Sequence, residues 1–184
     1  MLHKGMTKGE IEKFLNDKGN FVQIDYLTRF LKGDLTMDMK KFVFLKLADI
    51  YERINMKNEA AKMYSGAATV SITFAEKIKH LVKETELYVK SGTFEMADAA
   101  MKKALNEANS IEKNDIYFTV KEIYKKQAEF YEKNLKRFNA MKAYEKLLEM
   151  NIKDSEKKEI KEKLLALYEK LGKTKEYSAL NRTN

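Results

Sequence analysis

The sequence of 184 residues contains no cysteine and no proline, and only seven glycines and two histidines. Without cysteine there is no disulfide, no thiolate metal ligand and no thiol nucleophile. Without proline, nothing removes a backbone donor or clashes with the preceding turn, so helices can run long. Lys, Glu, Leu and Ala are the commonest residues, and all four favour helix. The sequence therefore predicts an all-α protein.

Signals for catalysis and for membrane insertion are also missing. The sequence has no Gly-rich phosphate loop, no zinc-deaminase signature and no serine in a nucleophile-elbow context. His80 has Glu76 four residues earlier but no further ligand at matching spacing, which favours an ordinary surface or groove histidine. No apolar run is long enough for a signal peptide or a membrane span. We expect a cytoplasmic protein that is not an enzyme, with no catalytic residue, metal, cofactor or membrane partner.

What the sequence does contain is a repeat. Four reference tyrosines, Tyr51, Tyr88, Tyr131 and Tyr168, follow one another at intervals of 37, 43 and 37 residues. Large side chains stand seven residues before three of them, and small alanines stand nine residues after three of them. A period of this length is typical of a stacked helical array, in which each hairpin buries its apolar face only against its neighbours.

The residue four places after each reference tyrosine marks the break within a unit. These residues are Asn55, Gly92, Leu135 and Gly172. Glycine and asparagine tolerate the left-handed conformation that ends a helix. Each unit is therefore predicted to be an antiparallel pair of helices joined at this position.

The pattern resembles the tetratricopeptide repeat. The first unit carries the family's spaced positions in full, and the others carry them in part; the first-unit residues are Phe44, Leu47, Ala48, Tyr51, Ala60, Tyr64 and Ala67. The intervals exceed the family's 34 residues and the closing proline is absent. In this the chain is similar to the SNAP-type and other divergent members of the superfamily. The resemblance covers residues 37 to 180 and implies a right-handed superhelical solenoid of antiparallel hairpins.

The breaks divide the chain into about nine to ten helices. We expect a degenerate hairpin in residues 1–34 and a repeat array with a short C-terminal capping helix in residues 35–184, forming one continuous domain. The expected helices are 7–17, 21–32, 38–54, 58–70, 72–91, 94–109, 114–133, 137–150, 155–171 and 174–182.

Basic residues recur at two fixed positions around the reference tyrosines. Five residues before and two residues after each tyrosine stand Lys46, Arg53, Lys83, Lys90, Lys126, Lys133, Lys163 and Lys170. Seven residues are nearly two helical turns, so the two members of each pair share one face. In the resembled family the first helix of each unit lines the concave groove. The candidate binding groove therefore carries two rows of basic side chains.

A structural interpretation explains the same pattern. Two residues before three of the tyrosines stand Asp49, Glu86 and Glu129, which are also candidate residues of the binding groove. Each acid lies one turn from both basic residues of its helix and can pair with them, which stabilises a solvated helix without any ligand. The sequence leaves both interpretations open.

Three functional hypotheses follow from the sequence. The first is a non-enzymatic interaction module that binds a protein or peptide, acidic in character, in the groove. The second is nucleic-acid (RNA) binding through the basic helical surface, suggested by a net charge of +8. The third is self-assembly through the solenoid ends, which expose apolar faces unless they are capped.

Overall fold

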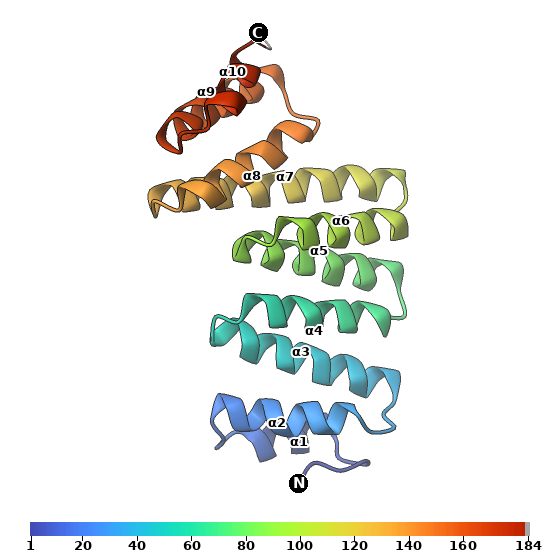
Figure 1. Cartoon of the computed structure of the whole chain (residues 1–184). Coiled ribbons are helices and arrows are strands. Elements are labelled where there is room, and N and C mark those ends of the chain that lie inside the picture. The colour runs from blue at the N-terminus through green and yellow to red at the C-terminus, as the bar shows by residue number, and fades with distance from the viewer. Residues whose placement is uncertain (183–184) are drawn as a thin grey trace.

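The computed structural model describes residues 1–182 and, within them, consists of ten α-helices without β-strands (Figure 1). The helices are α1 (Lys8–Leu15), α2 (Asn20–Leu31), α3 (Met37–Arg53), α4 (Lys57–Thr69), α5 (Phe74–Ser91), α6 (Phe94–Glu107), α7 (Ser110–Lys133), α8 (Arg137–Glu149), α9 (Asp154–Lys170) and α10 (Thr174–Asn181). The predicted all-α class is confirmed.

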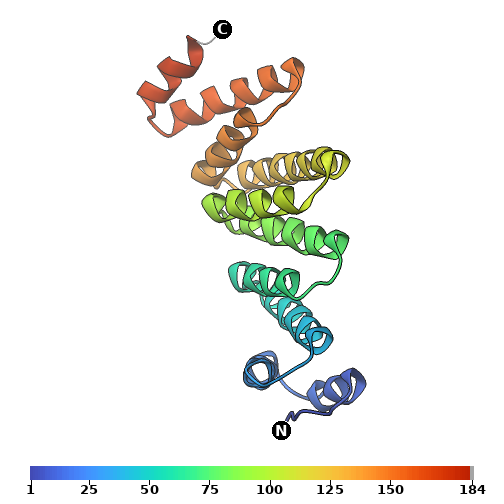
Figure 2. The same ribbon diagram turned by 90° about the vertical axis from the view of Figure 1, so that its right-hand side faces the viewer.

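The helices form a ladder of sequential antiparallel pairs with the two chain ends at opposite ends of the molecule (Figure 1). The pairs α3–α4, α5–α6, α7–α8 and α9–α10 each hold one reference tyrosine, and α2 packs against α3. Odd-numbered helices lie on one side of the ladder and even-numbered helices on the other (Figure 2). The TPR-like solenoid inferred from the repeat is therefore present.

The four units turn with the same backbone geometry. The residue four places after each reference tyrosine has a positive φ angle: 63° at Asn55, 81° at Gly92, 56° at Leu135 and 68° at Gly172. The carbonyl of each reference tyrosine accepts a hydrogen bond from the N–H five residues later, over 2.8 to 3.0 Å. This bond ends the first helix of each hairpin in a left-handed turn. The conformation occurs at all four positions, including Leu135.

Small residues set the close approach of the two helices in a hairpin. Ala60, Ala97 and Ala140, nine residues after a reference tyrosine, are fully buried. In α4, Gly66 lies against the Phe44 ring so closely that an added β-carbon would overlap the ring. The pattern of small residues in the sequence is thus the pattern of helix crossings.

The apolar core forms two clusters that meet at α3. One joins α1, α2 and α3 through residues such as Leu27 and Leu47, and the other runs from α4 to α9. Tyr51 packs against both clusters. At the C-terminal end α10 packs on α9 and contains no fully buried residue, so this end of the solenoid has a polar cover.

The largest difference from the expected helices is at α7, which begins at Ser110 rather than at residue 114. The Asn109 side chain accepts hydrogen bonds from the N–H groups of Ile111 and Glu112, and the Glu112 carboxylate accepts one from the Asn109 N–H. This capping box starts the helix early. With 24 residues against 18 in α5, α7 accounts for the six extra residues of the 43-residue interval.

Candidate protein-interaction surface

The basic residues of α3 are engaged by carboxylates of the protein itself. Lys46 forms an ion pair with Glu12 of α1, and its ammonium lies 5.8 Å from the centre of the Phe42 ring. Arg53 pairs with Asp49 at 2.8 Å within the helix. The first pair joins two units, and the second is the i,i+4 pair that the spacing suggests. The charge of this helix face is therefore largely compensated.

In α5 the acidic residue of the pattern binds both of its basic neighbours. Glu86 pairs with Lys83 at 3.1 Å and also with Lys90, and Lys83 pairs in addition with Glu52 of α3 at 3.3 Å. Burial alone would raise the pKa of Glu86, but the hydrogen bonds and charges of the two lysines outweigh it and lower the pKa. The structural interpretation of the basic rows describes this helix well.

In α7 the same positions are free. Lys126 and Lys133 are exposed, and neither forms an ion pair with any residue in the described part of the chain. Glu129 instead lines a small recess beside Tyr144 and Lys163. Glu52, which pairs with Lys83, directly follows the reference tyrosine of its unit. In the unit before α7 the equivalent residue is Val89. Lys126 therefore lacks the carboxylate of the preceding unit that its counterpart in α5 has.

In α9 one basic residue is engaged and one is free. Lys163 pairs with Glu159 at 3.1 Å, and its ammonium lies 5.6 Å from the centre of the Tyr144 ring. Lys170 is exposed and has no ion pair among residues 1–182. Where the earlier units carry an acid, this helix has Ala166. Within the two basic rows, the lysines without an ion-pair partner among residues 1–182 therefore lie in α7 and α9.

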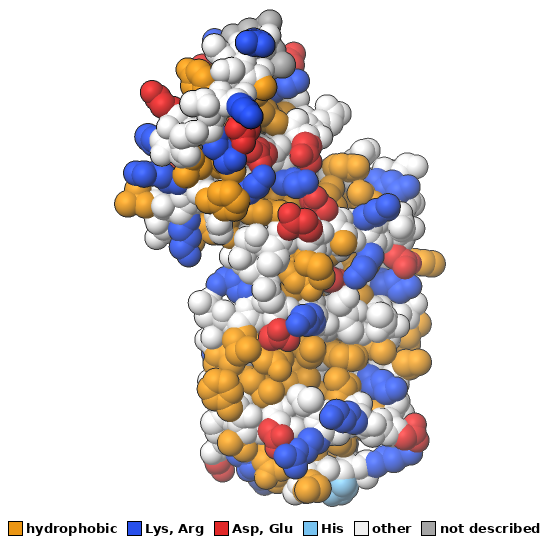
Figure 3. Space-filling view, in the orientation of Figure 1, with side chains coloured by type: hydrophobic (Ala, Val, Ile, Leu, Met, Phe, Trp, Pro, Cys, Tyr) orange, Lys and Arg blue, Asp and Glu red, His pale blue; other side chains and the backbone are white. Residues whose placement is uncertain are grey.

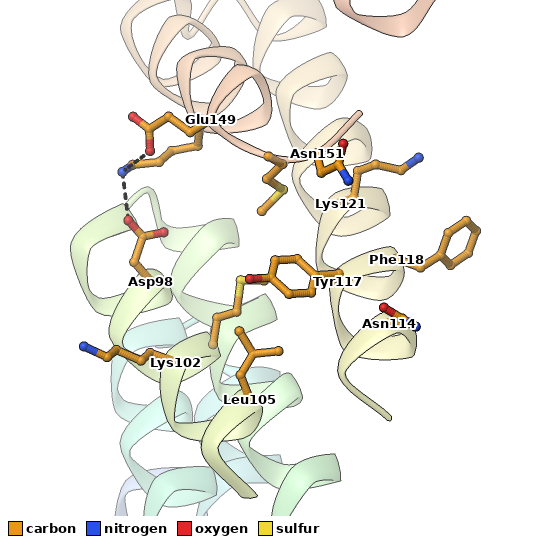
Figure 4. Close-up of a pocket in the computed structure, with 12 residues that line it drawn as sticks. Asp98, Lys102, Leu105, Asn114, Tyr117, Phe118, Lys121, Glu149 and Asn151 are labelled. Carbon is orange, nitrogen blue, oxygen red and sulfur yellow. Dashed lines mark hydrogen bonds and ion pairs between the residues drawn. The ribbon is translucent and has the colours of Figure 1, made fainter. Parts of the chain in front are cut away.

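A hollow that the sequence reading missed lies between α6, α7 and α8 (Figure 4). It measures about 780 Å³, and the Tyr117 side chain points into it while Phe118 points away. Lys146 closes one side by pairing with Asp98 at 2.8 Å and with Glu149 at 3.0 Å. The signal for this hollow was the 43-residue interval, because the hollow lies beside the extended N-terminal part of α7.

Two ionisable side chains are buried inside the ladder. His80, expected at the surface or in the groove, is only 9% exposed and lies beside the Tyr64 ring; burial lowers its pKa. Glu84 is 2% exposed, and burial raises its pKa although Lys103 lies 3.4 Å away. Its second carboxylate oxygen has no hydrogen-bond partner among residues 1–182. Among the described residues, no three side chains of the metal-binding types gather into a metal site.

Comparison with known proteins bears on the repeat array. Residues 38–184 match the family model described as soluble NSF attachment protein, SNAP. No curated protein matches the chain.

Proposed function

We propose that this chain attaches NSF to SNARE proteins. The premise is that the chain belongs to the soluble NSF attachment protein (SNAP) family of non-enzymatic adaptors. The family membership carries the class of function, which is protein interaction without catalysis. The choice of NSF and SNARE proteins as the partners is the proposal. A cytoplasmic location is part of the same proposal. No helix in the described part of the chain is long and apolar enough to cross a membrane.

One observation supports a particular contact surface. The exposed lysines Lys126, Lys133 and Lys170 have no ion-pair partner within residues 1–182, whereas Lys83 and Lys90 share Glu86. A free lysine offers its full charge to an acidic partner, while a paired one must first give up an existing contact. We therefore assign the acidic segment of the partner to the surface of α7 and α9 rather than to the whole length of the two basic rows.

The test compares two variants with equal loss of charge. Lys126→Gln with Lys170→Gln removes two free lysines, and Lys83→Gln with Lys90→Gln removes two lysines that already have partners. Binding to an immobilised SNARE bundle, and to NSF added afterwards, is measured at low and high salt. The first variant is expected to bind about three- to tenfold more weakly at low salt, with a smaller difference at high salt, because exposed pairs contribute modestly and are screened.

Three results would count against parts of this proposal. Equal weakening by both variants would remove the assigned surface but leave the adaptor function standing. No binding of the wild-type chain to either SNARE proteins or NSF would refute the adaptor function. Binding of RNA by the wild-type chain, without binding of SNARE proteins or NSF and with an affinity for RNA that falls steeply as salt rises, would favour the nucleic-acid hypothesis instead.

A further inference from the structure

The turn between α7 and α8 exposes large apolar side chains at the edge of the molecule. Phe130 is 52% exposed, Leu135 74% and Phe138 56%, all within nine residues. In Figure 1 this turn projects beyond the turn between α5 and α6, and Figure 3 shows hydrophobic side chains at that edge with Lys or Arg beside them. Single exposed apolar residues are ordinary on a protein surface, but three large ones within nine residues of a projecting turn suggest a contact.

The backbone conformation of this turn also suggests a contact. Leu135 has a φ angle of 56°, in the region where the equivalent residues of the other units are Asn55, Gly92 and Gly172. A β-carbon is disfavoured in this conformation, and the exposed leucine side chain gains little from burial in compensation. A residue held in an unfavourable conformation without a packing reason suggests a functional one.

The charges around the turn are also unfavourable for the fold alone. Lys136 and Arg137 are exposed and form no ion pair with the described residues. Lys136 and Arg137 stand at the start of α8, whose first turn contains no acid. Positive charge at a helix N-terminus opposes the helix dipole. The nearby Glu132 already accepts a hydrogen bond from the Tyr144 hydroxyl at 2.9 Å.

We propose that this α7–α8 tip, consisting of Phe130, Leu135, Lys136, Arg137 and Phe138, docks on an anionic phospholipid surface. The three apolar side chains enter the boundary between headgroups and acyl chains, and the two cations bind the headgroup phosphates and carboxylates. A projecting turn suits a flat surface better than a pocket-bearing protein. The contact needs no membrane span, although it departs from the expectation of no membrane partner. It does not depend on the proposed adaptor function.

The test is flotation of the full chain with vesicles of phosphatidylcholine alone or mixed with phosphatidylserine. The wild type is expected to float with the mixed vesicles and to remain behind with phosphatidylcholine. Leu135→Gly is expected to weaken this binding about tenfold, because one leucine no longer enters the lipid. Lys136→Gln with Arg137→Gln is expected to weaken it about fivefold per charge. The matched control is Ile72→Ser, which removes an exposed isoleucine in the turn between α4 and α5.

Leu135→Gly separates binding from folding, since glycine relieves the backbone and the variant is expected to fold at least as stably as the wild type. Weaker flotation of Leu135→Gly with unchanged flotation of Ile72→Ser supports the proposal. Wild-type chain that does not float with the mixed vesicles overturns it, as does Leu135→Gly that floats like the wild type. Loss of SNARE or NSF capture by the tip variants, with no vesicle binding by the wild type, also overturns it and makes the tip a protein contact.

Discussion

The left-handed position at Leu135 allows a stability prediction that can be worked from the structure. Leu135 has φ 56° at a turn where two sister units have glycine and one has asparagine. Replacing it by glycine removes the contact between the β-carbon and the following carbonyl, which costs an L-residue roughly 1–2 kcal/mol in this region. We therefore expect Leu135→Gly to stabilise the fold.

Two opposing effects reduce the gain. Glycine has more freedom in the unfolded chain, which costs roughly 0.5–1 kcal/mol on folding. The leucine side chain also loses its contacts, but it is 74% exposed, so this loss is small. The central values of the two ranges leave a net stabilisation of about 0.5–1 kcal/mol. For a chain of this size that corresponds to a rise in Tm of about 1–4 °C.

Urea titration with a fixed slope, together with thermal unfolding followed by circular dichroism, measures the change. Gly172→Ala is the mirror control, because Gly172 has φ 68° and an added β-carbon there meets no atom within 4 Å. That variant is expected to lose about 1 kcal/mol through backbone conformation alone. Gly92→Ala adds a contact of 2.6 Å with the Asn139 amide nitrogen and should lose more.

The order of the three variants in free energy of unfolding tests this explanation. If Leu135→Gly were destabilising while Gly172→Ala lost stability as expected, then the Leu135 side chain would have a structural role that its exposure does not reveal. If Gly172→Ala were neutral, the left-handed turn itself would carry no conformational cost, and the argument for the tip from backbone geometry would fail with it.

Two further changes test the interior. Gly66→Ala is expected to destabilise by about 1–3 kcal/mol, measured by urea titration, because the new β-carbon overlaps the Phe44 ring; Phe44→Leu in the same chain should recover part of the loss. Glu84→Gln is expected to stabilise by about 1 kcal/mol at neutral pH, because burial disfavours the charged carboxylate more than a neutral amide of the same shape. Since burial raises the pKa of Glu84, protonation favours the folded state, and the advantage should shrink as the pH falls through that raised pKa towards the ordinary glutamate value. An advantage independent of pH would contradict the assignment to the charge of Glu84.

Much of the fold could be predicted from residue spacing. The helix breaks follow from residues four places after each reference tyrosine, and the hairpin crossings follow from alanines such as Ala60 and Ala97. The early start of α7 was also readable, since Asn109 followed three residues later by Glu112 is a capping signal. These features are local, and local sequence determines them.

The candidate surface was less predictable, because spacing within one helix does not say what the next unit supplies. The pairs Asp49–Arg53 and Lys83–Glu86 lie within a helix and match the i,i+3 and i,i+4 pattern. Lys46 pairs instead with Glu12 of α1, and Glu129 pairs with neither Lys126 nor Lys133.

The sequence by itself therefore determined the period, the hairpin turns and the family, because these depend on residues a few positions apart that repeat along one chain. Only the tertiary structure decided which basic side chains remain free. Lys83 finds Glu52 across the unit boundary, while Lys126 has Val89 in the corresponding place. Ion pairs act over a few ångströms in space, so their presence depends on which residues the stacking of units brings together.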